Sequence, residues 1–175
     1  MESSYILVLG IGNLLNTDEG IGVHAVQQIK EQVGEVDGVA IEDGGTLGLN
    51  LLPLVEDATH LLILDAVNAG QPPGTVVELE KEAIPLYGGF KLSQHQLTFQ
   101  EVLGLALIRG RLPEYLHLIG VQPDSLEIGV GLSNKGIAAL PEVTRRSFKV
   151  LEDWGVLFPP RREPVEPSFA SNNQA

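Results

Sequence analysis

Cysteine is absent from this chain of 175 residues. Its absence excludes disulfides, thiolate metal sites and a cysteine nucleophile together. Basic residues are also few, because 11 lysines and arginines stand against 23 acidic side chains and give a net charge of −12. No block of Lys or Arg offsets this charge locally, so we expect neither nucleic acid nor an anionic membrane as a partner.

Long apolar runs are missing as well. The opening residues, MESSYILVLG, contain an acid, no basic segment and an apolar run of only about six residues, unlike a secretory signal. No later stretch approaches the roughly 18 uninterrupted apolar residues that suggest a membrane span. We therefore expect a cytoplasmic protein with one domain around one core.

Short apolar runs alternate with helical patterns, which is typical of βαβ units. Strands are expected at 5–9, 39–42, 60–67 and 115–121, and the very apolar 60–67 (HLLILDAV) suits the centre of a parallel sheet. The segment 74–80 (GTVVELE) follows a GQPPG turn too closely for a crossover helix, so it should pair antiparallel at an edge. The predicted fold class is α/β: a three-layer α/β/α sandwich with a mostly parallel, twisted sheet of about five strands, one edge strand antiparallel.

Helices are expected at about 18–33, 47–55, 93–109 and 141–154. Five apolar positions of the third helix fall on one face: Phe99, Val102, Leu103, Ala106 and Leu107. From residue 158 onward, prolines and polar residues predict a disordered tail. The domain therefore covers 1–157 and the tail covers 158–175.

The first loop reads GIGNLLNTDEGIGV and raises the question of a phosphate site. Gly10 and Gly12 fit the dinucleotide fingerprint, but Leu15 occupies its third glycine position, and no Walker motif follows. Asp18 and Glu19 already occupy the positive end of the first helix and would repel a phosphate. We expect no nucleotide. Simple helix capping is the competing interpretation of these two acids.

Further acids stand at the ends of predicted strands. Asp43 follows the second strand in IEDGGT, and Asp65 ends the central strand in LLILDAV. In such sheets, ligands bind beyond the carboxyl ends of the strands. A carboxylate there is costly to desolvate unless it is paired, protonated or bound to a cation. The alternative for Asp65 is a structural role, accepting hydrogen bonds from loop amides.

One histidine is expected at the same edge. Ser93 and Gln96 form a capping box that places His95 at the second helical position, where the helix dipole keeps the ring neutral for a metal. Glu19, Asp65 and His95 would then offer two oxygens and one nitrogen to a divalent ion such as zinc, nickel or cobalt. The other histidines are expected to be surface residues: His24, His60 and His117.

Five segments of this chain resemble the hydrogenase maturation endopeptidases, which trim the large subunit of nickel-iron hydrogenases. They are GIGNLLNTDEGIGV, DGGTLGLNLL, LLILDAVNAG, LSQHQLTFQEVL and GVQPDSLEIGVGLS, and the resemblance covers about residues 5–155. It implies an α/β/α sandwich with a five-stranded twisted sheet. It also implies that Glu19, Asp65 and His95 match metal-binding positions, and that Asp43 matches an acid important for activity.

The resemblance further implies the substrate. This is the precursor large subunit loaded with nickel, which loses a carboxy-terminal peptide after a His or Arg close to its nickel-binding cysteines. The nickel is carried by the substrate, although zinc, cadmium or nickel can occupy the site, and a monomer is expected. Asp43 is the candidate general base or water-orienting group. Without cysteine, and with Ser93 used as a cap, no covalent intermediate is expected.

Two other functions stay open at this point. One is a chaperone that inserts or checks nickel without cutting a bond. The other is an autonomous zinc metallopeptidase, against which the absence of an HExxH helix counts. For the favoured endopeptidase, the loop at 123–132 is expected to form one wall of the substrate cleft.

Overall fold

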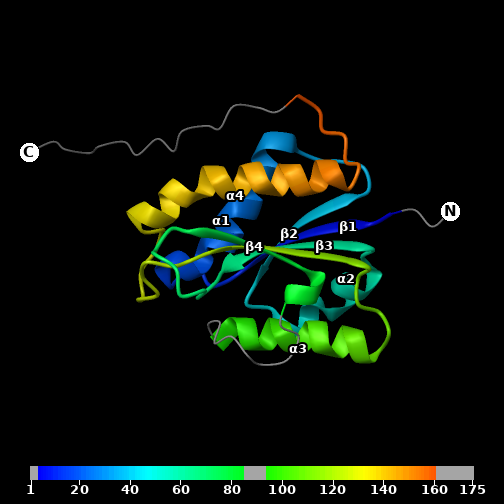
Figure 1. Ribbon diagram of the computed structural model, residues 1–175, viewed down its shortest axis with the longest axis horizontal. Coiled ribbons are helices and arrows are strands. Elements are labelled where there is room, and N and C mark those ends of the chain that lie inside the picture. The colour runs from blue at the N-terminus through cyan, green and yellow to red at the C-terminus, as the bar shows by residue number, and fades with distance from the viewer. Residues whose placement is uncertain (1–3, 85–93, 161–175) are drawn as a thin grey trace, which may run out of the picture.

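The computed structural model describes residues 4–84 and 94–160, without the side chains of 94–98 (Figure 1). The strands are β1 (Ile6–Ile11), β2 (Val39–Gly45), β3 (His60–Ala66), β4 (Val76–Glu80) and β5 (Tyr115–Val121). The α-helices are α1 (Ile21–Val33), α2 (Leu52–Asp57), α3 (Gln94–Ile108) and α4 (Asn134–Asp153). Three short 3-10 turns complete these elements: η1 (Thr17–Gly20), η2 (Gly48–Leu51) and η3 (Lys81–Ala83).

The strands form one sheet in the order β2-β1-β3-β5-β4. β1 pairs parallel with β2 and β3, and β3 pairs parallel with β5. β4 pairs antiparallel with β5 at one edge, as the short connection after β3 predicted. The predicted sheet of five strands with one antiparallel edge is confirmed.

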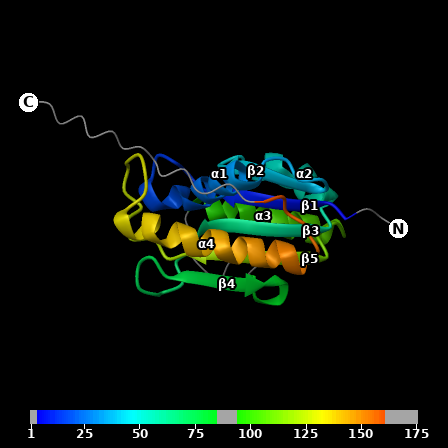
Figure 2. The ribbon, with the colours of Figure 1, turned by 90° about the horizontal axis from the view of Figure 1, so that it is seen from above.

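Helices cover both faces of the sheet, with α1 and α4 on one side and α2 and α3 on the other (Figures 1 and 2). Alternate residues of β3 serve the two cores: Leu62 and Leu64 pack with α1 and α4, whereas Leu61 and Ile63 pack with α2 and α3. All four are buried, which explains why this strand is apolar without alternation.

The predicted apolar face of α3 is confirmed at four of its five positions. Phe99, Val102, Leu103 and Ala106 are buried in the core beneath the sheet. Leu107 is 42% exposed, so its assignment to the buried face was wrong. It lies at the margin of the apolar stripe, where a helix turns its side chains towards solvent.

Three helix starts differ from the prediction. The helix expected at 47–55 begins as the turn η2, and α2 itself starts at Leu52. α4 begins at Asn134, well before Pro141, because the side chain of Ser133 caps the helix by accepting the Gly136 N–H at 3.0 Å. Pro141 lies inside the helix, although proline is more often found in a first turn. α1 begins at Ile21 rather than at Asp18, because the residues before it form the turn η1.

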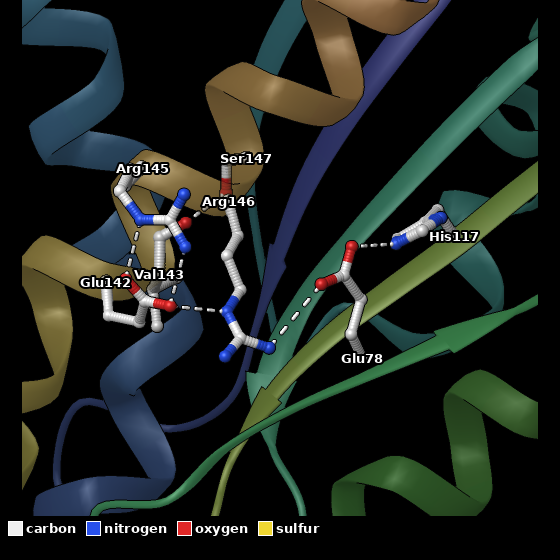
Figure 3. A network of polar contacts seen from close by, with 7 residues as sticks. All are labelled: Glu78, His117, Glu142, Val143, Arg145, Arg146 and Ser147. Carbon is white, nitrogen blue, oxygen red and sulfur yellow. Dashed lines mark hydrogen bonds and ion pairs between the residues drawn. The ribbon is translucent and has the colours of Figure 1, made fainter.

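Helix α4 is joined to the antiparallel edge of the sheet by a polar network (Figure 3). Glu142 accepts hydrogen bonds from Arg145 and Arg146, which lower its pKa to about 2. Arg146 also reaches Glu78 of β4 at 3.5 Å, and Glu78 lies 2.6 Å from Nε2 of His117 on β5. His117 is therefore a half-buried partner of an acid rather than an isolated surface histidine.

The end of the described chain packs against α4. The ring of Phe158 meets that of Phe148 edge-on, with centroids 5.0 Å apart. The predicted tail beyond this point, 161–175, lies outside the described residues. Within 4–84 and 94–160, no helix is both long enough and apolar enough to cross a membrane.

Candidate active site

The sheet order creates a topological switch point at the carboxyl ends of β1 and β3. The chain leaves β1 towards β2 on one side and then crosses to β3 on the other, so the connections diverge between β1 and β3. Such a switch point is where open α/β sheets bind ligands. Glu19 lies in the turn that follows β1, Asp65 lies near the end of β3, and Asp43 lies near the end of β2. The fold therefore brings the three predicted acids to one edge.

Glycines let the backbone of this edge pack closely. Gly12 has a φ of +131°, and a Cβ there would lie 1.7 Å from the carbonyl oxygen of Glu19. A Cβ on Gly22 would lie 2.0 Å from the carbonyl oxygen of Leu64. Because glycine has no Cβ at these two positions, the backbone of η1 and of the start of α1 can lie close to the ends of β1 and β3. The glycines of the first loop thus serve the packing of the chain against itself.

Two of the three acids at this edge are buried. Glu19 is 4% exposed and Asp65 is 5% exposed. Oδ1 of Asp65 accepts the N–H of Ala66 at 2.7 Å, as the structural interpretation of this residue required.

Asp43 differs from the other two acids because its side chain is exposed. It belongs to β2 itself, opposite Gly10 of β1, whereas the sequence placed it just after the strand. The strand extends to Gly45 beyond a bulge between Gly10 and Ile11. Asp43 is accordingly accessible to water and to a substrate, as a proton acceptor must be.

His95 is the second residue of α3, as predicted from the capping box. Its side chain, and Ser93, lie outside the described part of the molecule. Among the side chains that the structure does describe, no three His, Asp or Glu residues form a group able to hold a metal. The three-ligand set of Glu19, Asp65 and His95 therefore stays a prediction.

Asp18 has a role that the sequence did not reveal. It is 1% exposed, and its carboxylate accepts four hydrogen bonds from the segment after β5. The donors are the N–H groups of Asp124, Ser125 and Ser133 and the hydroxyl of Ser133. Because Ser133 caps α4, Asp18 supports the start of α4 rather than only its own helix. The sequence signal was an acid in a first turn, which does not identify a partner more than 100 residues away.

Comparison with known proteins decides the family. A model of the hydrogenase maturation protease family matches residues 23–148. The hydrogenase 2 maturation protease of Escherichia coli K12 is 40% identical over 157 residues, which span 89% of this chain and 96% of that protein. The hydrogenase expression/formation protein HoxM of Cupriavidus necator is 40% identical over 167 residues, or 94% of this chain and 83% of that protein.

The chain belongs to the hydrogenase maturation protease family. A solved structure, the hydrogenase maturating endopeptidase HybD from E. coli, superimposes with a TM-score of 0.84 at 37% identity and covers 90% of this chain and 98% of its own. This maturation protease is therefore an endopeptidase, and the resemblance found in the sequence is confirmed. The matched range includes Asp43, Asp65 and His95.

The Asp18 carboxylate makes this maturation protease sensitive to acid. Burial by itself raises the pKa of Asp18, but the hydrogen bonds from Ser133, Asp124 and Ser125 outweigh it and hold the pKa below 3.8. The folded-state pKa is thus lower than the unfolded one, so this stabilisation is complete above the unfolded value and is lost as pH falls through the folded value. In acid titrations of the unfolding free energy, Asp18→Asn should show a shallower loss below about pH 5 than the wild type. Equal slopes would contradict this assignment.

Proposed function

We propose that this protease removes a carboxy-terminal peptide from the nickel-loaded precursor of a nickel-iron hydrogenase large subunit. The nickel that the substrate carries is bound by Glu19, Asp65 and His95. Asp43 accepts a proton from the attacking water or orients that water. The observation that carries this proposal is the pair of buried carboxylates, Glu19 and Asp65, at the switch point of the sheet. Family membership and the names of the relatives support the choice of substrate.

Burial explains why a cation suits this site. A buried carboxylate is stabilised by an opposite charge, and two of them at one edge of the sheet favour a divalent ion over a neutral ligand. If the ion arrives with the substrate, its remaining positions are filled by substrate groups. Binding the ion then fixes the adjacent peptide bond relative to the enzyme, which converts a bimolecular encounter into an oriented one.

We assign Asp43 to the hydrolytic step. In this step a water oxygen adds to the scissile carbonyl carbon, and a water proton passes to the carboxylate of Asp43. The C–N bond then breaks, and the leaving amine takes up that proton from the carboxyl group of Asp43. The exposed position of Asp43 on β2 allows water to reach it, in contrast to the buried Glu19 and Asp65. The different environments of these acids support their different roles.

The decisive experiment compares three substrates by mass spectrometry. We expect the purified protein to shorten the nickel-loaded precursor, to leave the nickel-free precursor intact and to leave unrelated peptides intact. Because the ion positions the scissile bond, the rates with and without nickel should differ by roughly 100-fold or more. A protein that binds loaded precursor without shortening it would be a chaperone. One that cuts unrelated peptides and contains stoichiometric zinc as purified would be an autonomous metallopeptidase.

A further inference from the structure

Exposed apolar side chains gather on two loops at the carboxyl edge of the sheet. We call them the apolar rim: Leu15, Leu126, Ile128 and Val130, with exposed fractions of 61%, 45%, 91% and 88%. Leu15 follows β1 in the loop that leads to Glu19, and the other three lie between β5 and α4. The two segments, blue and yellow, lie together at one end of the molecule in both views (Figures 1 and 2).

The rim is held by backbone pairing rather than by a core beneath it. The N–H of Gly129 donates to the carbonyl of Leu15 at 2.8 Å, and the N–H of Thr17 donates to the carbonyl of Gly129 at 3.0 Å. Asn16 and Gly129 thereby form a parallel bridge next to Ile128. The carbonyl of Leu126 accepts from the side chain of Asn16 at 3.3 Å.

Further bonds fix the same segment from the enzyme side. The hydroxyl of Thr17 donates to the carbonyl of Ser125 at 2.7 Å, and the carboxylate of Asp18 binds the segment at both of its ends. Thr17 adopts a φ of +48°, a backbone conformation that is uncommon for a β-branched residue. Strain of this kind persists where surrounding bonds impose it, and it concentrates at functional sites. These hydrogen bonds therefore hold the segment that carries the apolar rim in a defined conformation.

We infer that the apolar rim is the docking surface for the folded protein substrate, which it contacts through apolar residues of that substrate beside the cleaved segment. This inference rests on the proposed function and extends it from the nickel to the protein that carries it. Leu15 of the rim lies in the loop that leads to Glu19, and the segment that carries the other rim residues is hydrogen-bonded to that loop, so a substrate whose nickel reaches the buried acids would have the rim beside it. Burial of exposed Ile and Val side chains would stabilise that complex without involving the chemistry.

A second copy of this chain is a poorer occupant of the rim. Each copy carries a net charge of −12, which opposes self-association. A partner that brings a cation to the two buried carboxylates gains an attraction that a second copy of this chain does not supply. A second copy bound at the rim would make the enzyme a dimer in the absence of substrate, and a measurement of the oligomeric state detects this.

The test uses Ile128→Ser combined with Val130→Ser in the full chain, with the nickel-loaded precursor as substrate. We expect KM for the precursor to rise roughly tenfold or more while kcat stays within about twofold, because only binding contacts are lost. The matched control is Ile108→Ser combined with Leu157→Ser, which are 74% and 90% exposed and lie at the end of α3 and after the end of α4. The control should leave both constants unchanged, and both variants should melt close to the wild type.

Binding measurements separate this inference from the proposed function. In an Asp43→Asn background, which binds without cutting if the proposed function holds, the rim variant should bind precursor roughly tenfold more weakly than the unmodified rim. If the wild type binds precursor but does not cut it, the proposed function fails while such weakening still supports docking. Equal affinities, an unchanged KM, or a wild-type dimer that the rim variant converts to monomers with KM unchanged would each overturn the inference.

Discussion

Asp65→Asn is expected to abolish processing of the nickel-loaded precursor while leaving the fold intact. Asparagine has the same size and keeps an oxygen that can accept the N–H of Ala66, but it lacks the charge that binds a cation. Because the ion is proposed to hold and polarise the scissile bond, kcat/KM should fall by roughly 10²- to 10⁴-fold. The substitution keeps the size of the side chain and the bond to Ala66, so the variant should still unfold cooperatively in urea, which shows that it is folded.

The control for this prediction is Asp153→Asn. Asp153 is exposed at the end of α4 and pairs with Lys149 at 2.5 Å, away from the switch point. Processing by this variant should match that of the wild type. A titration with nickel-loaded and nickel-free precursor adds a second readout, because Asp65→Asn should weaken binding of the loaded form alone. Normal processing by a folded Asp65→Asn protein would show that Asp65 has only a structural role.

Asp18→Ala is expected to give the largest loss of stability among single substitutions at this edge. The change removes a buried carboxylate that accepts four part-buried hydrogen bonds. Hydrogen bonds to a charged group contribute about 1.5–3 kcal/mol each, and water can reach some of the donors after the change, so a total loss of about 3 kcal/mol is expected. Urea unfolding measures this loss directly.

Two further variants calibrate the Asp18 result. Ser133→Ala removes one of the four bonds and the cap of α4, and should cost about 1 kcal/mol. Asp153→Ala removes an exposed ion pair and should cost less than about 1 kcal/mol. Precursor processing by Asp18→Ala should also slow, because the segment that carries the apolar rim loses its attachment. If Asp18→Ala and Asp153→Ala lose the same free energy of unfolding, the carboxylate of Asp18 does not stabilise the segment between β5 and α4.

Local patterns sufficed for the fold because each element carried its own signal. The unbroken apolar run of β3 indicated a central strand, and the short connection before β4 indicated an antiparallel edge. The same topology placed Glu19, Asp43 and Asp65 at one edge before any coordinates, since parallel strands end together. The start of α3 at Gln94 also agrees with the capping box that located His95.

The features that sequence reasoning missed depend on partners distant in the chain. The sequence predicts a helix start at Pro141, whereas the cap that decides the start of α4 is Ser133, itself fixed by Asp18. For Asp18 the sequence indicates a capping role only towards the helix that follows it. The environment of His117 likewise depends on Glu78, which the antiparallel pairing of β4 and β5 brings opposite to it. Propensity and spacing report on residues that are close in the sequence, whereas these contacts join residues that are far apart in it.

The bond between Asp18 and Ser133 joins residues 115 positions apart. The bonds between η1 and the start of α4 therefore form only after the chain has been synthesised beyond Ser133 and α4 has packed against the sheet. Long-range closures of this kind form late, because the entropy of a large loop must be overcome first. A chain that ends before Ser133 lacks two of the four donors to Asp18, so it should hold the loop that carries Glu19 less firmly than the full chain does.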